Sequence, residues 1–545
     1  MKAKYLFSLV AMSVMMAACS NEDDLSQLSD NSPKQSDGIH FKATIGSKGN
    51  TSEATRALTE EGNKIVAEWQ VGEELLLSYN VEGETEEVST VATVSAVDPT
   101  TGAATIEAEL DENVKNNTPV NLVYPRNYNK YWYGDFGLED FFLGGDLVAG
   151  FCDLPTVSSD MDARRGTGTI ISRGDEATLD GPVSLAPLFA ICKFTFLDEN
   201  NQPLNITRME IINATTNDMI KLFNPLTCGP DLSYYVPMPS LDGVSVRFRG
   251  SDGTDYYKAT ATATLEVGKF YRPTVKMTKI PAPVPLSAVT EDHLGFVINQ
   301  DGIVYPPGTE GQTIIAMIGY VGGPGSADTS NPSDNWRGLA VGLAAFDKSN
   351  MPERTDNDNT FSWSFDKKLS YSISEVDALL DLRGISNTQQ MPKTPEENFS
   401  VTGYSYGWMY PLGWALSRYA FNAPDGTSGW FIPAAGQWVK VLNAFGAHFT
   451  NTLQLQGQSM LRPDGLNVDG VFSGYPGGRF RTYFYSLTDL NFDNGYYYSF
   501  TSTRAESYNG WACAYRVAFY HHAPYNFFGS YCKSNGNAFP FFAFR

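Results

Sequence analysis

The sequence has few of the residues that metal and thiol sites need. Only 5 histidines occur in 545 residues, and the 6 cysteines include no Cys-x-x-Cys pair. Tetrahedral zinc sites and Cys/His catalytic pairs draw on such residues, with metal ligands at characteristic spacings. We therefore predict no metal, no cofactor and no catalytic activity.

Positive charge and long apolar runs are also scarce. The 39 Lys and Arg stand against 61 Asp and Glu, which gives a formal net charge of −22. This excess of negative charge argues against nucleic acid and anionic membrane surfaces as partners. Solubility outside the cell is the simplest meaning of the charge.

The N-terminus has the parts of an export signal. Two lysines precede an apolar run from Tyr5 to Ala18, which is shorter than the ~20 residues that span a bilayer. The letters MAAC at its end resemble a bacterial lipobox, so residues 1–18 are predicted to be a signal peptide and Cys19 to be acylated. Residues 19–38 are polar and predict a disordered tether. The acidic run after Cys19 also resembles the surface-export signal of Bacteroidota lipoproteins, which predicts a surface-exposed outer-membrane lipoprotein.

The rest of the chain is long enough for about three domains. Residues 39–279 contain short alternating runs, such as ATIEAEL at 104–110, separated by turn residues. We expect two β-sandwiches, 39–160 and 161–279, although any boundary between Leu154 and Asp180 fits. Residues 280–290 are proline-rich and predict a stiff, extended linker.

The third predicted domain, residues 291–545, is unusually aromatic toward its end. Phe, Tyr and Trp make up 24 of the last 75 residues, and helices are expected from Ser374 and over 434–445. Tyr and Trp are enriched at recognition surfaces, although any single ring is as well explained by a place in the core. The candidate ligand surface comprises Tyr496, Tyr497, Trp511, His521, His522, Tyr525 and Asn526.

Several motifs of residues 39–279 occur in a characteristic order. They are Ala54-Thr55-Arg56, Trp69, Gly72-Glu73, Leu75 to Tyr79, NLVYP at 121–125, PVSLAPLFAICKFTF at 182–196 and VGKFYRPTVKMTK at 267–279. In this order they resemble the fimbrillin family, the pilus subunits of Bacteroidota.

The resemblance implies a mechanism of assembly. In fimbrillins, cleavage after the arginine is thought to release the first strand, and a strand of a neighbouring subunit fills the groove by β-strand addition. The chain is thus expected to be cut between Arg56 and Ala57, to lose its lipid anchor and to bind other fimbrial subunits. Stalk subunits end in a donor segment, whereas this chain continues for about 265 residues, so a tip position is expected. Arg56 stands in a polar segment ahead of the first strand that the sequence predicts, Glu74 to Tyr79. From physics alone, a solvated arginine without a role is the favoured interpretation of Arg56, and the resemblance is what makes it a cleavage site.

The third domain carries a second resemblance. Gly429-Trp430-Phe431-Ile432-Pro433, followed by Gln437-Trp438, resembles the GW-x-LP-x-x-x-EW core of C-type-lectin-like domains, as in Fibrobacter-type paralogous and formylglycine-generating-enzyme-like domains. Gln437 replaces the usual Glu. The last residues, NAFPFFAFR, stand where such domains usually have VR-x-VR and have lost one of its arginines. The resemblance implies an α+β lectin-like fold that mediates adhesion to a glycan or protein ligand.

The expected fold is therefore mainly β: two fimbrillin-like (transthyretin-like) β-sandwiches followed by an α+β C-type-lectin-like domain. Cys513 and Cys532 lack a nearby base in sequence, so a disulfide or two separate buried thiols are favoured over a reactive pair. Two alternatives to a cleaved tip subunit stay open. An uncleaved pilus anchor, or a stand-alone surface lipoprotein that binds a glycan or protein, would keep Cys19.

Overall fold

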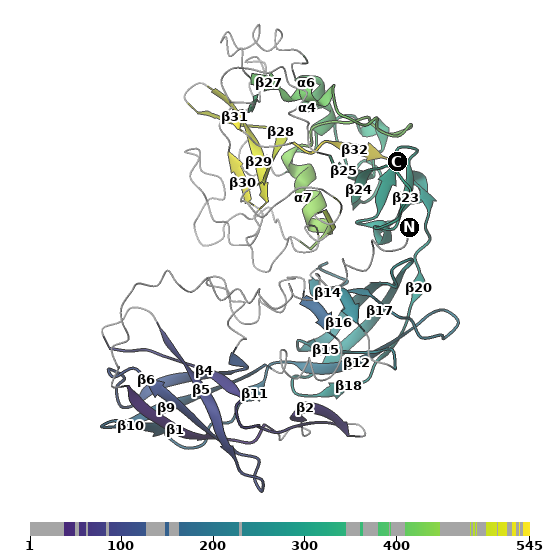
Figure 1. The fold of residues 1–545 in the computed structure, drawn as a ribbon. Helices are drawn as coiled ribbons and strands as arrows, with labels where there is room; N and C mark the ends of the chain where they lie inside the picture. The colour runs from purple at the N-terminus through teal and green to yellow at the C-terminus, as the bar shows by residue number, and fades with distance from the viewer. Residues whose placement is uncertain are drawn as a thin grey trace, which may run out of the picture.

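The computed structural model describes most of the three expected regions. The described residues are 38–48, 54–61, 64–82, 87–126, 148–151, 163–217, 219–227, 231–344, 360–362, 380–391, 393, 409–446, 480, 483–484, 487, 497–508, 511–519, 526–529, 533–534 and 538–545. These residues are mainly in strands (Figure 1), as the composition and alternation predict.

The first sheet closes on itself. Its strand order is β10-β1-β6-β5-β4-β7-β9-β11, and β10 pairs with β9 as well as with β1. The closure makes one barrel-like sheet where two stacked sheets were expected. The strands are β1 (Ile39–Ile45), β4 (Glu74–Tyr79), β5 (Val88–Val97), β6 (Ala104–Leu110), β7 (Thr118–Tyr124), β9 (Arg164–Arg173), β10 (Glu176–Leu179) and β11 (Ala186–Pro187).

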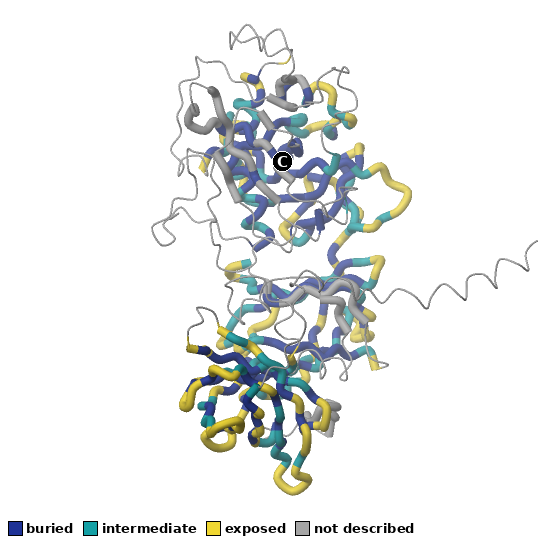
Figure 2. The backbone as a smooth tube through the Cα atoms, turned by 60° about the vertical axis from the view of Figure 1, so that its left-hand side comes forward, coloured by how far each residue is buried: buried dark blue, intermediate teal, exposed yellow. Residues whose placement is uncertain are grey.

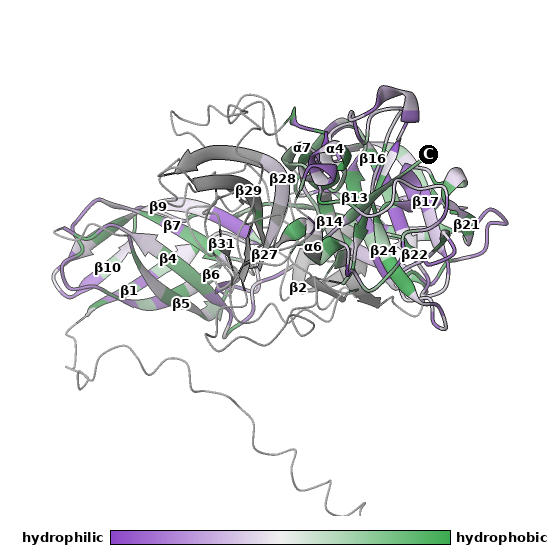
Figure 3. Ribbon diagram, turned by 90° about the horizontal axis from the view of Figure 1, so that it is seen from above, coloured by the Kyte–Doolittle hydropathy of each residue, from purple (hydrophilic) through white to green (hydrophobic). Residues whose placement is uncertain are grey.

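Alternation along these strands builds the core of the first sheet. In β1 and β6 every second residue is buried, and the residues between them are exposed or partly exposed. Hydrophobic and hydrophilic positions alternate visibly along the strands in Figure 3. Such a period of two is what places one face of a strand in a core.

The expected boundary between the first two domains at residue 160 is wrong. Strands β9, β10 and β11 all pair within the first sheet, which therefore extends to Pro187. The next strand, β12 (Ala190–Leu197), already belongs to the second domain.

The second domain is a sandwich of two sheets. One has the order β15-β12-β18 with β19 also on β12, and the other has the order β20-β17-β16-β13-β14-β8. Phe194 and Phe196 of β12 share one core with Ile211 and Phe248, which lie on β13 and β16 of the other sheet. The further strands are β8 (Val148–Phe151), β13 (Arg208–Asn213), β14 (Met219–Thr227), β15 (Ser233–Met238), β16 (Leu241–Ser251), β17 (Tyr256–Leu265), β18 (Phe270–Tyr271), β19 (Thr274–Lys276) and β20 (Thr278–Lys279).

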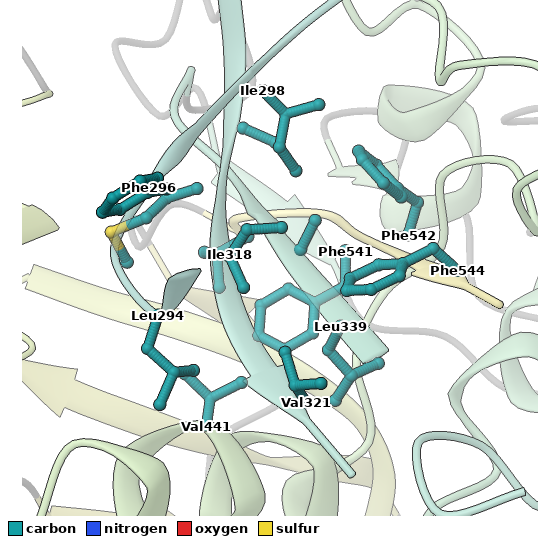
Figure 4. Close-up of a cluster of buried hydrophobic side chains, with 14 of the residues drawn as sticks. Leu294, Phe296, Ile298, Ile318, Val321, Leu339, Val441, Phe541, Phe542 and Phe544 are labelled. Carbon is teal, nitrogen blue, oxygen red and sulfur yellow. The ribbon is translucent and has the colours of Figure 1, made fainter. Parts of the chain in front are cut away.

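The C-terminal domain surrounds a sheet of order β21-β23-β22-β24-β25-β32. Helix α7 packs on β24, a predominantly hydrophobic strand (Figure 3), and Figure 4 shows the side chains between them. The strands are β21 (Val284–Pro285), β22 (Val297–Asn299), β23 (Ile303–Tyr305), β24 (Ile314–Val321), β25 (Gly338–Gly342) and β32 (Phe541–Phe544). The short 3₁₀ helices are η3 (Leu286–Ala288), η4 (Glu291–His293) and η5 (Pro332–Asp334).

Two small sheets and three helices complete this domain. The sheets have the orders β27-β26-β31 and β28-β29-β30. Helix α7 matches the helix expected over 434–445, whereas the helix expected from Ser374 falls on residues outside the described ones. The elements are β26 (Thr360–Ser362), α4 (Gly384–Gln389), β27 (Met409–Pro411), α6 (Leu412–Leu416), α7 (Ala435–Ala444), β28 (Tyr497–Tyr508), β29 (Trp511–Phe519), β30 (Asn526–Gly529) and β31 (Lys533–Ser534). No helix within the described ranges is long and apolar enough to cross a membrane.

The segment expected to be an extended linker is packed into the C-terminal domain. Ile280, Leu286 and Val289 are buried members of that domain's core. The Arg337 guanidinium donates to the carbonyl oxygens of Leu286, Ser287 and Val289. Residues 280–290 are therefore a junction packed into the C-terminal domain, which corrects the prediction of a stiff, extended linker between domains.

A buried charge cluster joins the second domain to the C-terminal domain. Met209 and Ile211 of β13 face the sandwich core, so Arg208 and Glu210 face the opposite way. Figure 2 shows buried residues both in the second domain and in the C-terminal domain, and Tyr483 of the C-terminal core contacts Glu210. This second face of β13 is covered because the C-terminal domain lies against it.

Glu210 is the acceptor at the centre of that cluster. The Tyr483 hydroxyl donates to Glu210 Oε1, and the Arg208 and Arg249 guanidiniums lie 3.4 and 3.8 Å from its two oxygens. Arg249 also lies over the rings of Tyr483 and Phe296 at 5.3 and 5.1 Å. Burial raises the pKa of the Tyr483 hydroxyl, which therefore stays a neutral donor. One carboxylate thus balances two buried cations within the second domain, and Tyr483 and Phe296 contact this cluster from the C-terminal domain.

Replacing Glu210 by Gln is expected to lower the free energy of unfolding by about 3 kcal/mol or more, because both guanidiniums lose their buried counter-charge. Differential scanning calorimetry of the full chain measures the loss.

Asp255→Asn is the matched control for this substitution. It breaks the Lys279–Asp255 pair, whose side chains are 50% and 29% exposed, and is expected to cost under about 1 kcal/mol. Equal losses for the two variants would contradict a junction held by Glu210.

Candidate functional site

The first strand closes the first sheet and supplies part of its core. β1 forms seven antiparallel pairs with β6, from Ile39–Leu110 to Ile45–Ala104, and parallel pairs with β10. Its four inward side chains are almost fully buried, with exposed fractions of 8% for Ile39, 0% for Phe41, 4% for Ala43 and 0% for Ile45. Each large apolar side chain of this kind contributes roughly 1.5–3 kcal/mol. β1 is therefore a full structural member, although it comes first in the described chain.

The arginine of the predicted cleavage site lies shortly after β1, in a separate hairpin. The hairpin is formed by β2 (Ala54–Glu61) and β3 (Lys64–Ala67), which among the described strands pair only with each other. Arg56 was expected in a polar segment without regular structure, so its place on a strand is a correction.

The pairing of this hairpin breaks around the predicted scissile bond. Ala54 pairs with Ala67, but Thr59 already pairs with Val66, so four residues of β2 face no partner in the ladder. Arg56 and Ala57 are two of these four. Bulged backbone of this kind lacks ladder hydrogen bonds, and a protease must bind its substrate in an extended, unpaired form.

A buried lysine fixes the chain between β1 and the hairpin. Lys48 lies three residues beyond the end of β1, and its side chain is 0% exposed. Its Nζ is 2.6 Å from Glu73 Oε1, 4.2 Å from the Trp69 ring centroid and 4.0 Å from the Tyr124 ring centroid. We call Trp69, Glu73 and Tyr124 the lysine cage.

Hydrogen bonds hold the cage and the backbone that enters it. The Tyr124 hydroxyl donates to Glu73 Oε1 at 2.7 Å, and the Gln70 amide donates to Glu73 Oε2 at 2.9 Å. Trp69 Nε1 donates to the Gly46 carbonyl at 2.8 Å, and the Arg164 guanidinium donates to the Lys48 carbonyl. The site therefore binds both the Lys48 ammonium and the backbone at Gly46 and Lys48.

The sequence motifs include the three residues of the lysine cage but not Lys48, which it surrounds. Trp69, Gly72-Glu73 and NLVYP, which contains Tyr124, appeared as separate motif letters. Neither β1 nor Lys48 was singled out, although the strict alternation of IHFKATI is a visible strand signal. That alternation predicts the strand β1. Nothing in the sequence, however, distinguishes Lys48 from a solvated lysine.

The candidate ligand surface is only partly within the described residues. Tyr497, Trp511 and Asn526 lie on β28, β29 and β30, while Tyr496, His521, His522 and Tyr525 fall outside the described residues. Tyr497 pairs with Phe519, next to the pairing of Ala518 with Asn526, whereas Trp511 pairs with Tyr508 at the other end. Eight residues of β29 separate the two ends, or about 26 Å. Tyr497 and Asn526 thus lie at the same end of this sheet, on the two strands that flank β29, and Trp511 lies at the other end.

The structure describes only some of the cysteines that the sequence analysis considered. Cys19 and Cys532 lie outside the described residues, and Cys513 is placed only by its position on β29. Cys192 is a buried free thiol whose pKa is raised to about 12 by burial, so it stays protonated and unreactive. Within the described ranges no cluster of three or more His, Cys, Asp or Glu could hold a metal ion.

Gln437, the residue that departs from the lectin-like pattern, lies in a buried polar network. Its Oε1 accepts from the Ala434 amide at 2.8 Å, and its Nε2 donates to the Ala327 carbonyl at 3.0 Å and to Asp328 Oδ2 at 2.9 Å. Burial raises the pKa of the Asp328 carboxyl, against hydrogen bonds from Ser330, Ile385 and Gln437. A glutamate side chain at this position would face the Asp328 carboxylate directly, which explains the glutamine.

Comparison with known proteins finds fimbrial and adhesion structures. No family model matches the sequence, and no curated protein sequence matches it either. A fimbrial protein from Bacteroides ovatus aligns over 93% of this chain and 99% of its own, with 14% identity and a TM-score of 0.26. A fimbrial assembly protein from Parabacteroides distasonis covers 44% of this chain and 90% of its own, with 12% identity and a TM-score of 0.26.

A third match has a lower TM-score. A streptococcal ancillary pilin covers 50% of this chain and 82% of its own, with 7% identity and a TM-score of 0.19. At these scores the likeness assigns neither a residue role nor an activity to this chain.

Replacing Gln437 by Glu is expected to destabilise the C-terminal domain by about 3 kcal/mol at pH 7, because two carboxyl groups then share one buried site. The pKa of the introduced carboxyl in the folded chain would lie above its unfolded value of ~4.3. The loss is therefore complete above the folded pKa and disappears as the pH falls to the unfolded pKa. Thermal unfolding at pH 4 and pH 7 measures it.

Gln389→Glu is the control, because it makes the same change at an exposed position of α4 in the same domain. It is expected to shift stability by under about 0.5 kcal/mol at either pH. A loss for Gln437→Glu that does not depend on pH would rule out carboxylate repulsion as its cause.

Proposed function

We propose that this chain is the lipid-anchored precursor of a surface pilus subunit, and that it polymerises after cleavage between Arg56 and Ala57. Signal-peptide removal leaves an acylated Cys19 that holds the precursor at the outer membrane. Cleavage then frees the chain from its anchor. A strand from another fimbrial subunit takes the place of β1.

The observation that carries the proposal is the position of β1 relative to Arg56. β1 lies wholly upstream of the bond, while both strands that flank it, β6 and β10, lie downstream. Loss of β1 would leave two edges with unpaired N–H and C=O groups beside emptied apolar sockets. Such an edge binds an extended segment by main-chain hydrogen bonds, and alternate side-chain sockets give specificity.

The hairpin geometry supports release at this bond. Of the β2–β3 pairs, only Ala54–Ala67 precedes Arg56, and the pairs from Thr59 to Glu61 follow it. A cut after Arg56 therefore separates the β1 segment with the loss of one pair, and the remaining hairpin stays with the subunit.

The proposal gives the subunit a tip position, with the third domain as its adhesive part. β32 pairs with β25 and all four of its residues are buried, so this strand is engaged in its own sheet rather than offered to a neighbour. In the proposal, the C-type-lectin-like domain of residues 291–545 contacts a glycan or protein, with Tyr497 and Asn526 at one end of the sheet β28-β29-β30. The uncleaved anchor and the stand-alone surface lipoprotein remain the alternatives.

The mature N-terminus tests the proposal. Mass spectrometry of protein sheared from the cells is expected to give Ala57 as the first residue, and protein left in the outer membrane is expected to give acylated Cys19. Arg56→Lys keeps the positive charge but removes the site of an arginine-specific protease. This variant is expected to remain in the membrane fraction with Cys19 as its first residue. If the wild-type chain occurs only with Cys19 as its first residue, the cleaved subunit is ruled out. An uncleaved anchor or a stand-alone lipoprotein then remains.

A further inference from the structure

The lysine cage and its occupant lie on opposite sides of the proposed cut. Lys48 precedes Arg56, whereas Trp69, Glu73 and Tyr124 all follow it. Processing would therefore carry the lysine away together with β1 and leave every wall of the cage in the subunit. Glu73 would lose the ammonium that lies 2.6 Å from it, and two aromatic rings would lose the cation between them.

The emptied cage has the chemistry of a receptor for a primary ammonium. A buried carboxylate and the faces of a Trp and a Tyr attract a cation strongly when water is excluded. The lysine ammonium is a compact charge at the end of a flexible stem, whereas the guanidinium is a planar fork that suits bidentate partners. Two rings at about 4 Å from one nitrogen fit the compact group.

We propose that the cage selects the incoming strand of the partner subunit, by binding a lysine three residues beyond that strand's last inward apolar side chain. The inference rests on the strand replacement proposed above. The occupant it names is an extended segment with apolar residues at four alternate positions followed by this lysine, running in the direction of β1. The segment 39–48 of this chain is the pattern for it, with Ile39, Phe41, Ala43 and Ile45 inward and Lys48 in the cage.

The cage would fix the register of the incoming strand, which apolar sockets alone do not determine. A slip by one residue turns every inward side chain outward and is strongly disfavoured. A slip by two residues keeps the faces and changes only which apolar side chain fills which socket. The cage is a single charged socket at one end of the row, so it accepts its lysine in one register only.

The test uses strand exchange with labelled peptides. The soluble chain from residue 20 receives a recognition sequence for a site-specific protease directly after Arg56, so that cutting does not depend on the native protease. After cutting, a fluorescent peptide of residues 38–50 is added, and its uptake is followed by anisotropy in competition with unlabelled variants.

Three variant peptides isolate the cage. Lys48→Met removes the caged ammonium. Lys42→Met removes the same charge from the outward face of the same strand, where the side chain is 61% exposed. The third peptide moves the lysine by two residues, through Lys48→Asn together with Asn50→Lys.

The native and Lys42→Met peptides are expected to bind alike, and the other two are expected to bind roughly 30-fold more weakly or worse. Equal binding of all four peptides would overturn selection by the cage and leave strand replacement standing. Equal weakening by Lys42→Met and Lys48→Met would also overturn it, because it would show a general charge effect. No uptake of any peptide would overturn strand replacement itself, and the cage proposal with it.

Discussion

The first sheet is closed only because β1 pairs on both of its edges. It contributes a seven-residue ladder to β6 and a shorter parallel contact to β10, with four side chains in the core. The chain that follows is held at Gly46 by the Val183 carbonyl and by Trp69, and then at Lys48 by the cage. The closure thus fixes where the chain leaves the sheet and enters the hairpin with Arg56.

Much of this sheet could be predicted from its alternation, but its closure could not. The strands expected at Glu74–Tyr79 and Ala104–Leu110 occur with those bounds. Strand β9, RRGTGTIISR with Gly166 and Gly168, lies within the stretch from Leu154 to Asp180 in which the domain boundary was expected. These glycines are needed inside the sheet, since a Cβ on Gly168 would meet Val183 Cγ2 at 2.8 Å. Pairing of β9 and β10 with distant strands left no local signal, so the domain boundary was placed too early.

The candidate site was predicted in pieces for a similar reason. The sequence motifs contain Trp69, Glu73 and Tyr124 but do not show that the three side chains surround Lys48. That lysine lies 25 residues before Glu73. The proline-rich segment failed differently. Its prolines predicted a stiff spacer, while its apolar side chains, such as Ile280 and Leu286, had a core available to them in the next domain. Burial of apolar surface outweighed the local preference for extended, solvated chain.

Three buried polar sites share a feature that bears on their purpose. The Lys48–Glu73 pair, the Glu210 cluster and the Gln437–Asp328 contact each join segments that are far apart in the sequence. Well-packed apolar residues often stabilise such positions as well or better, because charges are costly to remove from water. Stability alone therefore does not account for them. A buried charge accepts one partner in one geometry, so these sites specify which segments meet and in what register. The proposed replacement of β1 by a partner strand would depend on that specification.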